Sequence, residues 1–326
     1  MGGSGSKPAN LSIWLDKPCY NAGDTLSGKV YLLVTQPDYF ADTLQVSLSG
    51  REATRIRYTT GSGKKRKSRT ARAQRNIMVV DLPLHQFPDS KCTPGQFEFP
   101  FSLVLPETLP TSMFVDDGLS GCQVFYEISA RLNRPGWTTW DVTARQPFNV
   151  SQIPRALMPS AVFCEPAIIP VNSCFCCYNG SMAIGASLDS GMVTRGGVVN
   201  VMFACKNDSV AVGESMPVNV SEVCSWNAGT RRRSFTRLLT QRLFNPSDIP
   251  GCRPAPEVGP TIDDQVSAKM CRDIFDQLKT GAGFQAALQL PVDTRDSYSG
   301  GLIKVKSSHS LSLSLSLSLS LSLSLF

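Results

Sequence analysis

The chain has 326 residues, of which 42% are hydrophobic and 18% charged, a composition typical of a globular protein long enough for two domains. Its net charge of +6 is modest, and its 11 cysteines are scattered and odd in number, which excludes a disulfide-dense secreted scaffold and predicts reduced thiols. There is no run of 18 apolar residues to predict a membrane span, and the first ten residues lack the apolar segment of a signal peptide.

Residues 1–10 are expected to form a flexible leader, because they are rich in glycine and serine. Gly2, followed by Ser6, also fits the pattern for N-myristoylation after removal of the first methionine. One acyl chain holds a protein on a membrane only marginally and needs a basic patch beside it. Gly2 is therefore a candidate acylation site, and a plain flexible leader is the alternative.

Alternating apolar residues then predict three β-strands. These cover residues 11–15, 26–34 and 44–48, and Gly50 is expected to end the third. Residues 21–24, with the sequence Asn-Ala-Gly-Asp, predict a tight turn before the second strand.

Residues 61–75 interrupt this alternation with a run of basic side chains and no acid. We interpret the segment as a solvated hairpin loop that attracts acidic lipid headgroups, phosphorylated protein tails or nucleic acid, or acts as a nuclear import signal. Because no aromatic residue interleaves the run, base stacking is disfavoured. We expect acidic lipid or phosphorylated cargo as the ligand and keep nucleic acid as the alternative. The candidate binding residues are Lys64, Lys65, Arg66, Lys67, Arg69, Arg72 and Arg75.

The strongest alternation follows a predicted strand at residues 77–84. Every second side chain between residues 97 and 105 is aromatic or aliphatic, which predicts a half-buried strand facing a core. Further strands are expected at 122–132 and 137–150. Many short strands separated by turn signals, without helical periodicity, predict an all-β sandwich. The inward positions of the central strand are Phe97, Phe99, Phe101, Leu103 and Leu105.

These motifs resemble the N-terminal domain of the arrestin family, and most of all its arrestin-domain-containing (α-arrestin) branch. The resemblance lies in the aromatic strand, the two Leu-Pro steps after it and the strand that opens at Gly121. It implies two tandem arrestin-like sandwiches of immunoglobulin type. The positions that match the family's opening turn and strand are Tyr20, Gly23, Asp24, Leu26 and Gly28.

An internal repeat agrees with two copies of one sandwich. Leu188 and Asp189 repeat Leu15 and Asp16 at an offset of 173 residues, and Gly196 repeats Gly23 at the same offset. We assign residues 1–10 to the leader, 11–150 to an arrestin-like N-terminal domain, 151–175 to a linker, 176–309 to an arrestin-like C-terminal domain and 310–326 to a Ser-Leu low-complexity tail.

The second predicted domain holds a second basic cluster and a helix. The helix is expected at residues 261–278, with Thr261 and Asp264 as a capping box and an apolar stripe that packs on the sandwich. The apolar stripe consists of Val266, Met270, Ile274 and Leu278. The basic cluster consists of Arg231, Arg232 and Arg233, with Arg237 and Arg242 further along.

Motifs for catalysis and for metal binding are missing from the sequence. It has no P-loop, no Gly-x-Ser-x-Gly and no His-Glu-x-x-His, and only two histidines. Cys174, Cys176 and Cys177 lack the spacing of a tetrahedral zinc site. We therefore expect no enzyme, no cofactor and no metal.

The resemblance implies a cytosolic adaptor that links membrane-protein cargo to endocytic or endosomal sorting and ubiquitination machinery, peripheral to the plasma membrane or endosomes. The α-arrestin branch recruits ubiquitin ligases through Pro-Pro-x-Tyr motifs, and this sequence contains none, so direct binding to WW domains is not expected. The alternatives are a nucleic-acid-binding or nuclear protein that uses residues 61–75, and a purely structural sandwich protein.

Overall fold

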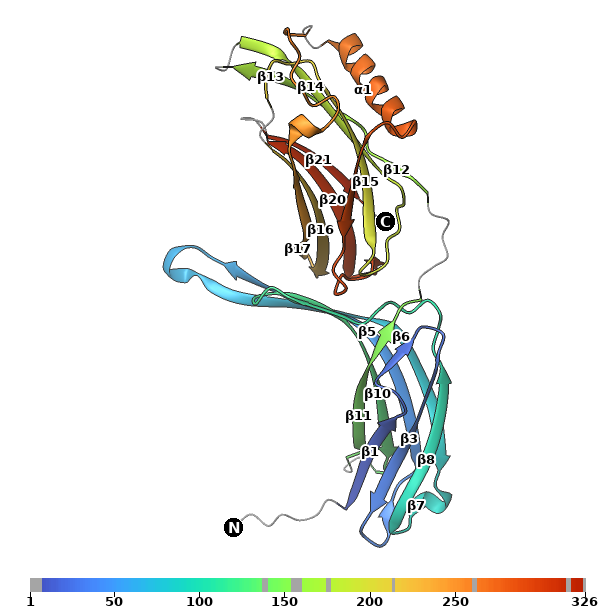
Figure 1. Ribbon diagram of the computed structural model, residues 1–326. Coiled ribbons are helices and arrows are strands. Elements are labelled where there is room, and N and C mark those ends of the chain that lie inside the picture. The colour runs from blue at the N-terminus through green and yellow to red at the C-terminus, as the bar shows by residue number, and fades with distance from the viewer. Residues whose placement is uncertain are drawn as a thin grey trace. The chain divides into compact units, whose positions relative to one another are not determined.

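The computed structural model describes residues 8–136, 140–153, 160–173, 177–212, 215–259, 263–314 and 318–324. Its regular structure is almost entirely β-sheet, with one α-helix among the described residues (Figure 1), so the prediction of an all-β protein is confirmed. The chain divides into two compact units. Unit 1 comprises Met1–Arg155, Ser225–Arg233 and Tyr298–Lys304, and unit 2 comprises Ala156–Cys224, Ser234–Ser297 and Val305–Phe326.

Unit 1 is built from two main sheets and a two-stranded ribbon. The first sheet has the order β1-β3-β8, with β1 (Ala9–Leu15), β3 (Thr25–Val34) and β8 (Gly95–Val104). The second has the order β2-β11-β10-β5-β6, with β2 (Cys19–Asn21), β11 (Val142–Ser151), β10 (Gly121–Asn133), β5 (Thr43–Thr60) and β6 (Lys67–Gln86), and β9 (Met113–Asp116) also pairs with β10. The ribbon pairs β4 (Tyr39–Phe40) with β7 (Lys91–Cys92).

The core of unit 1 consists of the alternate side chains that the sequence pattern selects. Leu26 and Val30 of β3, Leu48 of β5 and Ile128 of β10 are all fully buried. Tyr126 is buried with them and donates a hydrogen bond from its hydroxyl to the Pro110 carbonyl at 2.7 Å. Burial raises the pKa of this hydroxyl well above its usual value, so Tyr126 stays a neutral donor.

The tight turn predicted at residues 21–24 is present. The Asp24 N–H donates to the Asn21 carbonyl at 3.0 Å, and the Asp24 carboxylate accepts the Asn21 N–H at 2.8 Å. Gly23 adopts a φ of 83°, which a side chain would disfavour. This turn delivers the chain into β3.

One face of strand β8 points toward the core, as predicted, but the side chains on that face are buried to different degrees. Phe101 is buried, and Leu105 just beyond the strand is buried with it. Phe97, Phe99 and Leu103 are half-buried on the same face. Because β8 lies at the edge of its sheet, its outer aromatics are covered on one side only.

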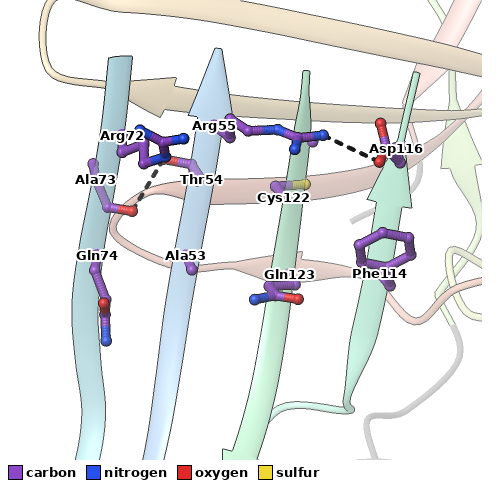
Figure 2. Close-up of a pocket in the computed structure, with 11 residues that line it drawn as sticks. Ala53, Thr54, Arg55, Arg72, Ala73, Gln74, Phe114, Asp116, Cys122 and Gln123 are labelled. Carbon is purple, nitrogen blue, oxygen red and sulfur yellow. Dashed lines mark hydrogen bonds and ion pairs between the residues drawn. The ribbon is translucent and has the colours of Figure 1, made fainter. Parts of the chain in front are cut away.

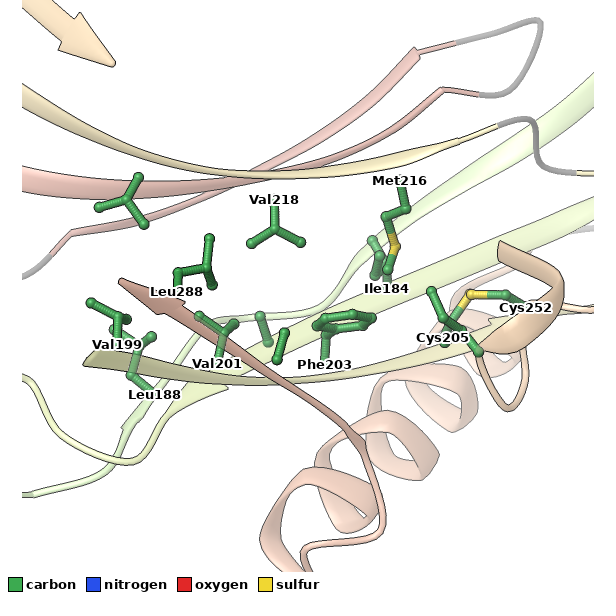
Figure 3. Packing of buried hydrophobic residues seen from close by; sticks show 14 of the residues in the cluster. Ile184, Leu188, Val199, Val201, Phe203, Cys205, Met216, Val218, Cys252 and Leu288 are labelled. Carbon is green, nitrogen blue, oxygen red and sulfur yellow. The ribbon is translucent and has the colours of Figure 1, made fainter. Parts of the chain in front are cut away.

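Unit 2 repeats the sandwich plan around its own core. One sheet has the order β12-β14-β15-β18, with β12 (Val162–Phe163), β14 (Cys177–Leu188), β15 (Val198–Asn207), β18 (Phe284–Gln289) and, pairing with β14, β13 (Ala167–Ser173). The other has the order β17-β16-β20-β19, with β17 (Arg231–Phe244), β16 (Met216–Ala228), β20 (Ile303–Ser314), β19 (Tyr298–Ser299) and, pairing with β20, β21 (Ser318–Ser324). Of this sheet, β19 and residues 225–228, 231–233 and 303–304 belong to unit 1. Figure 3 shows the buried cluster between these strands, in which Phe203 is fully buried and its ring centroid lies 5.1 Å from that of Phe284.

The predicted helix is α1 (Asp264–Lys279), and its buried residues Met270, Ile274 and Leu278 pack against Ala183 and Ala204, as expected for an apolar stripe on a sandwich. The predicted cap is different. Asp263 is the N-cap, and its carboxylate accepts the Val266 N–H at 2.7 Å. The capping-box prediction is wrong because the N-cap is Asp263, so Asp264 is the first helical residue and not the third, and Thr261 is outside the described residues.

The internal repeat is visible as an identical strand register. In unit 1, Leu15 of β1 pairs with Gly28 of β3. In unit 2, Leu188 of β14 pairs with Val201 of β15, which is the same pair displaced by 173 residues. The offset seen in the sequence therefore corresponds to two equivalent hairpins, one in each unit.

The boundaries that we assigned to the domains stay a prediction. Two short strands, β12 and β13, occupy part of the stretch assigned to the linker, and both pair with β14. Strand β20 continues into the Ser-Leu repeat and pairs there with β21. Three 3-10 turns complete the regular structure of the described residues: Gly63–Lys65, Pro88–Ser90 and Pro246–Asp248.

Candidate anion-binding hairpin

The basic segment lies on a long hairpin formed by β5 and β6. Two expectations from the sequence are wrong here. Gly50 does not end β5, which continues to Thr60, and residues 67–75 are not loop but the first half of β6. The physical reason is backbone pairing: the whole segment is in register with β5, from Thr60 opposite Lys67 to Glu52 opposite Arg75. Hydrogen bonds to β5 impose the extended conformation although the side chains show no apolar alternation.

The loop itself is short and tight. It spans residues 61–66, and the Lys65 N–H donates to the Ser62 carbonyl while the Arg66 N–H donates to the Gly63 carbonyl, both at 3.2 Å. Gly61 has a φ of 82°, and a Cβ there would lie 2.5 Å from the Lys65 carbonyl oxygen. A side chain at Gly61 would therefore open the turn.

The register places cations on both faces of β6. Arg69 and Arg75 lie opposite Tyr58 and Glu52 on one face, and Arg72 lies opposite Arg55 on the other. The seven predicted binding residues are all exposed, and within the described part of the chain none of them forms an ion pair. An uncompensated row of cations on a narrow ribbon attracts anions from both sides.

The second basic cluster adds to this surface through residues that belong to unit 1. The Arg231 guanidinium stacks over the Tyr58 ring, with its carbon 4.5 Å from the ring centroid. Arg233 donates to the Asp117 carboxylate at 2.9 Å. The structure therefore places Arg231 on the hairpin and Arg233 on the turn before β10, although the two basic clusters lie about 160 residues apart along the chain.

Asp117 is in its charged carboxylate form when it binds Arg233. Burial disfavours the carboxylate, but the N–H groups of Ser120 and Leu119 and the Arg233 guanidinium outweigh that effect and hold the pKa of Asp117 below its usual value. All three arginines are exposed, but Arg233 is paired with a carboxylate, whereas Arg231 and Arg232 form no ion pair among the described residues.

Arg237 and Arg242 do not join this surface. Arg237 belongs to unit 2, where it pairs with Asp293 at 2.7 Å and with the buried Glu222 at 3.6 Å. Arg242 donates to the Ala287 carbonyl at 3.2 Å. Both cations are used inside their own unit.

A pocket of about 440 Å³ opens at the base of the hairpin (Figure 2). Cross-strand pairing aligns its walls in two rows on one face of the sheet, one with Arg72, Arg55 and Asp116 and the next with Gln74 and Phe114. Arg55 is paired with Asp116 at 3.2 Å, whereas Arg72, the other cation in the pocket, has no carboxylate partner in the part of the chain that the structure describes. The smallest members of the rows, Gly121 in the first and Ala53 in the second, leave the space open.

A buried carboxylate beneath the hairpin was missed by the sequence analysis. Glu52 is 1% exposed and accepts hydrogen bonds from the Tyr298 hydroxyl at 2.7 Å and the Leu302 N–H at 3.1 Å. Thr54, two residues on, donates to the Asn227 carbonyl at 2.6 Å. These bonds hold residues 225–233 and 298–304 on unit 1. The sequence did contain a signal for this site, because Glu52 is an acid at a position that the alternation of β5 directs toward the core.

Other predicted sites fall elsewhere. Gly2 lies outside the described residues, as do Cys174 and Cys176. Within the described residues no three His, Cys, Asp or Glu side chains are grouped as metal ligands. No described helix has the length and apolar character to cross a membrane.

Comparison with known proteins agrees with the geometry of unit 1. Residues 11–155 match the family model of the arrestin (or S-antigen) N-terminal domain. A search of curated proteins found no match to the chain. Arrestin-family proteins are in general non-enzymatic adaptors or scaffolds that bind cargo and trafficking machinery, and they are typically cytosolic. The two-sheet sandwich of unit 1, its opening turn into β3 and the family match together identify residues 11–155 as an arrestin N-terminal domain.

Proposed function

We propose that the protein is a non-enzymatic cytosolic adaptor that binds phosphorylated tails of membrane-protein cargo through the β5/β6 hairpin. It then links this cargo to endocytic or endosomal sorting and ubiquitination machinery, at the cytoplasmic face of the plasma membrane or endosomes. The observation that carries the proposal is a set of seven exposed cations, from Lys64 to Arg75, on an arrestin-type domain, and none of them has a carboxylate partner among the described residues.

The arrangement of the cations favours a protein tail over a membrane surface. A flat bilayer meets one face of a hairpin, whereas Arg69 and Arg72 project from opposite faces of β6. The tip, residues 61–66, also carries no apolar side chain to enter the headgroup region. A flexible phosphorylated chain can contact both faces and use charge-assisted hydrogen bonds to arginine.

Nucleic acid is less well supported at this hairpin. Binding of single strands uses exposed aromatic rings on which bases stack. Tyr58 is the aromatic residue of β5 beside the basic run, and Arg231 covers its ring. The phosphates of a duplex remain an outcome for the binding experiment to report.

The test compares three ligands at about 150 mM salt, because charge-driven binding is meaningful only at a stated ionic strength. They are a cargo-tail peptide in phosphorylated and unphosphorylated forms, vesicles that contain a phosphoinositide, and duplex DNA. The test variant changes Lys64, Lys65, Arg66, Lys67 and Arg69 to Gln. Loss of one charge-assisted hydrogen bond costs about 1.5–3 kcal/mol, so affinity for the phosphopeptide should fall about tenfold or more.

A matched control removes five exposed cations from other parts of unit 1 by changing Lys17, Lys29, Lys91, Arg131 and Arg145 to Gln. This control should bind the phosphopeptide within about twofold of the wild type, since distant exposed charges are screened at this salt. The proposal is wrong if the wild type prefers vesicles or DNA to the phosphopeptide, or if both quintuple variants lose the same affinity.

A further inference from the structure

Strand β6 forms the outer edge of its sheet. The strand order ends β10-β5-β6, and within the described residues no strand pairs with the other side of β6. The strand is 20 residues long, and none of its side chains is buried. A free edge of this length presents a row of unpaired N–H and C=O groups, which is a template for pairing with another strand.

The edge has two chemically different halves. Residues 67–75 carry Lys67, Arg69, Arg72 and Arg75, whereas residues 77–82 are mostly apolar. Val79 is 52% exposed and Val80 is 38% exposed, so both are accessible to a partner. A shift of register opposite Gly50 and Arg51 marks the change from one half to the other.

We propose that β6 accepts an extended segment of the cargo as an additional strand, with acidic or phosphorylated residues opposite residues 67–75 and aliphatic residues opposite residues 77–82. The inference rests on the proposed function and specifies how the same hairpin recognises its ligand. Backbone hydrogen bonds supply the pairing, and the side chains of the two halves supply charge and apolar contact. The preferred partner is therefore a phosphorylated stretch next to a β-branched stretch, and phosphate alone is insufficient.

Charge decides between this occupant and a second copy of the chain. Edge-to-edge pairing of two β6 strands in parallel would place the cations of one copy beside those of the other, which is destabilising. Lysine and arginine on an edge strand are a common means of preventing such self-pairing. An anionic strand removes the repulsion and gains contacts from both faces.

The decisive experiment uses a synthetic peptide of about twelve residues, with phosphoserines at alternating positions followed by alternating valines. Two N-methylated versions carry the same number of methyl groups, one on the odd and one on the even residues. In a strand, alternate N–H groups point to opposite edges, so only one series blocks the bonds to β6. That series should bind about tenfold more weakly or worse, and the other should bind within about twofold of the unmethylated peptide.

Amide hydrogen exchange gives an independent readout. On binding, alternate amides in residues 67–82 should gain protection, while those of β1, at the edge of the other sheet, should not change. A substitution tests the apolar half of β6. Val79→Lys should weaken binding several-fold, whereas the isosteric Val79→Thr should retain most of the affinity. Because Val79 is exposed, neither substitution should disturb the fold.

The outcomes separate the two proposals. If both methylated series bind as well as the parent peptide, or lose affinity equally, strand addition is overturned while the proposed function stands. If the phosphorylated parent itself does not bind, the proposed function fails. If the free protein doubles in mass and β6 is protected without peptide, the occupant is a second copy, and the inference is wrong.

Discussion

Glu52 shows how a single side chain ties distant segments of unit 1 together. Its carboxyl group accepts hydrogen bonds from two donors, the Tyr298 hydroxyl and the Leu302 N–H, in a site that water hardly reaches. A buried carboxylate is tolerated only when such partners offset the loss of hydration. Glu52 lies on β5 opposite Arg75 of β6, so its hydrogen bonds attach the base of the basic hairpin to Tyr298 and Leu302.

Replacing Glu52 with Gln should destabilise the protein by about 1–3 kcal/mol, because the amide keeps the size but has one acceptor oxygen for the two groups that donate to Glu52. Urea denaturation measures the change. Glu107→Gln, at an exposed position, should stay within about 0.5 kcal/mol of the wild type. Equal stability of the Glu52 variant and the wild type would contradict the role of Glu52 as an essential buried acceptor.

Asp117 predicts a specific dependence of stability on pH. Its pKa in the folded protein is lower than the usual 3.8, so the stability that it contributes is present above pH 3.8 and is lost as pH falls through the folded value. Asp117→Asn should therefore lower Tm near neutral pH, and the gap to the wild type should shrink as the solution is acidified below pH 3.8.

Thermal scans across the acid range provide the measurement. Asp38→Asn is the control, since Asp38 is exposed and has a φ of 54°, a conformation that asparagine also adopts readily. A gap between Asp117→Asn and the wild type that stays constant down to the lowest pH would show that Arg233 and the turn do not stabilise the charged form.

At the scale of the element, β6 and β8 show how sheet edges change the meaning of a sequence pattern. β8 keeps a clear alternation because one of its faces covers a core. β6 has no buried side chain, so its sequence shows no alternation and its basic half was predicted as loop. Its extended form comes from pairing with β5 over its full length. An edge strand that is exposed on both faces does not need alternating apolar residues, but it does need a neighbouring strand to pair with.

The graded burial of β8 predicts unequal losses from the same substitution. Phe101 is 6% exposed and should cost about 3–5 kcal/mol when changed to Ala, as large buried aromatics do. Phe99→Ala should cost distinctly less, because Phe99 is half-buried and contacts His85 and Phe97 at the sheet edge. Chemical denaturation of both variants checks the order, and a larger loss at Phe99 would reverse our assignment of the strand's inner end.

At the scale of the whole molecule, the two units are built on one plan. The β1/β3 hairpin of unit 1 and the β14/β15 hairpin of unit 2 share a register displaced by 173 residues, and in each unit a third strand, β8 or β18, extends the same sheet. Only unit 2 adds a helix on this sheet, within the described residues. The equivalent strands therefore differ in what covers them: α1 packs on β14 and β15, whereas no described helix packs on β1 and β3.

The Ser-Leu tail should matter little to the stability of this plan. Among the side chains of β20 whose burial the structure describes, Ile303, Val305 and Ser307 are buried, and all three come before the repeat begins. Truncation after Leu315 removes β21 and should leave Tm nearly unchanged while improving solubility, because a strictly alternating strand promotes aggregation. A large fall in Tm after this truncation would show instead that β21 is an integral part of the sheet.

Much of the fold and part of the candidate site follow from local pattern. Alternation at residues 26–34 and 97–105 predicted half-buried strands, the turn at Gly23 was evident from its residues, and the basic run was identified by composition alone. These features depend on neighbours along the chain, and a sequence displays them directly.

The rest was decided by tertiary structure, because it depends on contacts between residues far apart in the chain. Pairing with β5 makes residues 67–75 a strand, and the stacking of Arg231 on Tyr58 joins two basic clusters into one surface. Arg237, only a few residues further on, is instead neutralised by carboxylates of unit 2. Which cations remain free to bind a partner is thus set by where the folded chain places the acids, since each charge is either paired or left to solvent by its spatial neighbours.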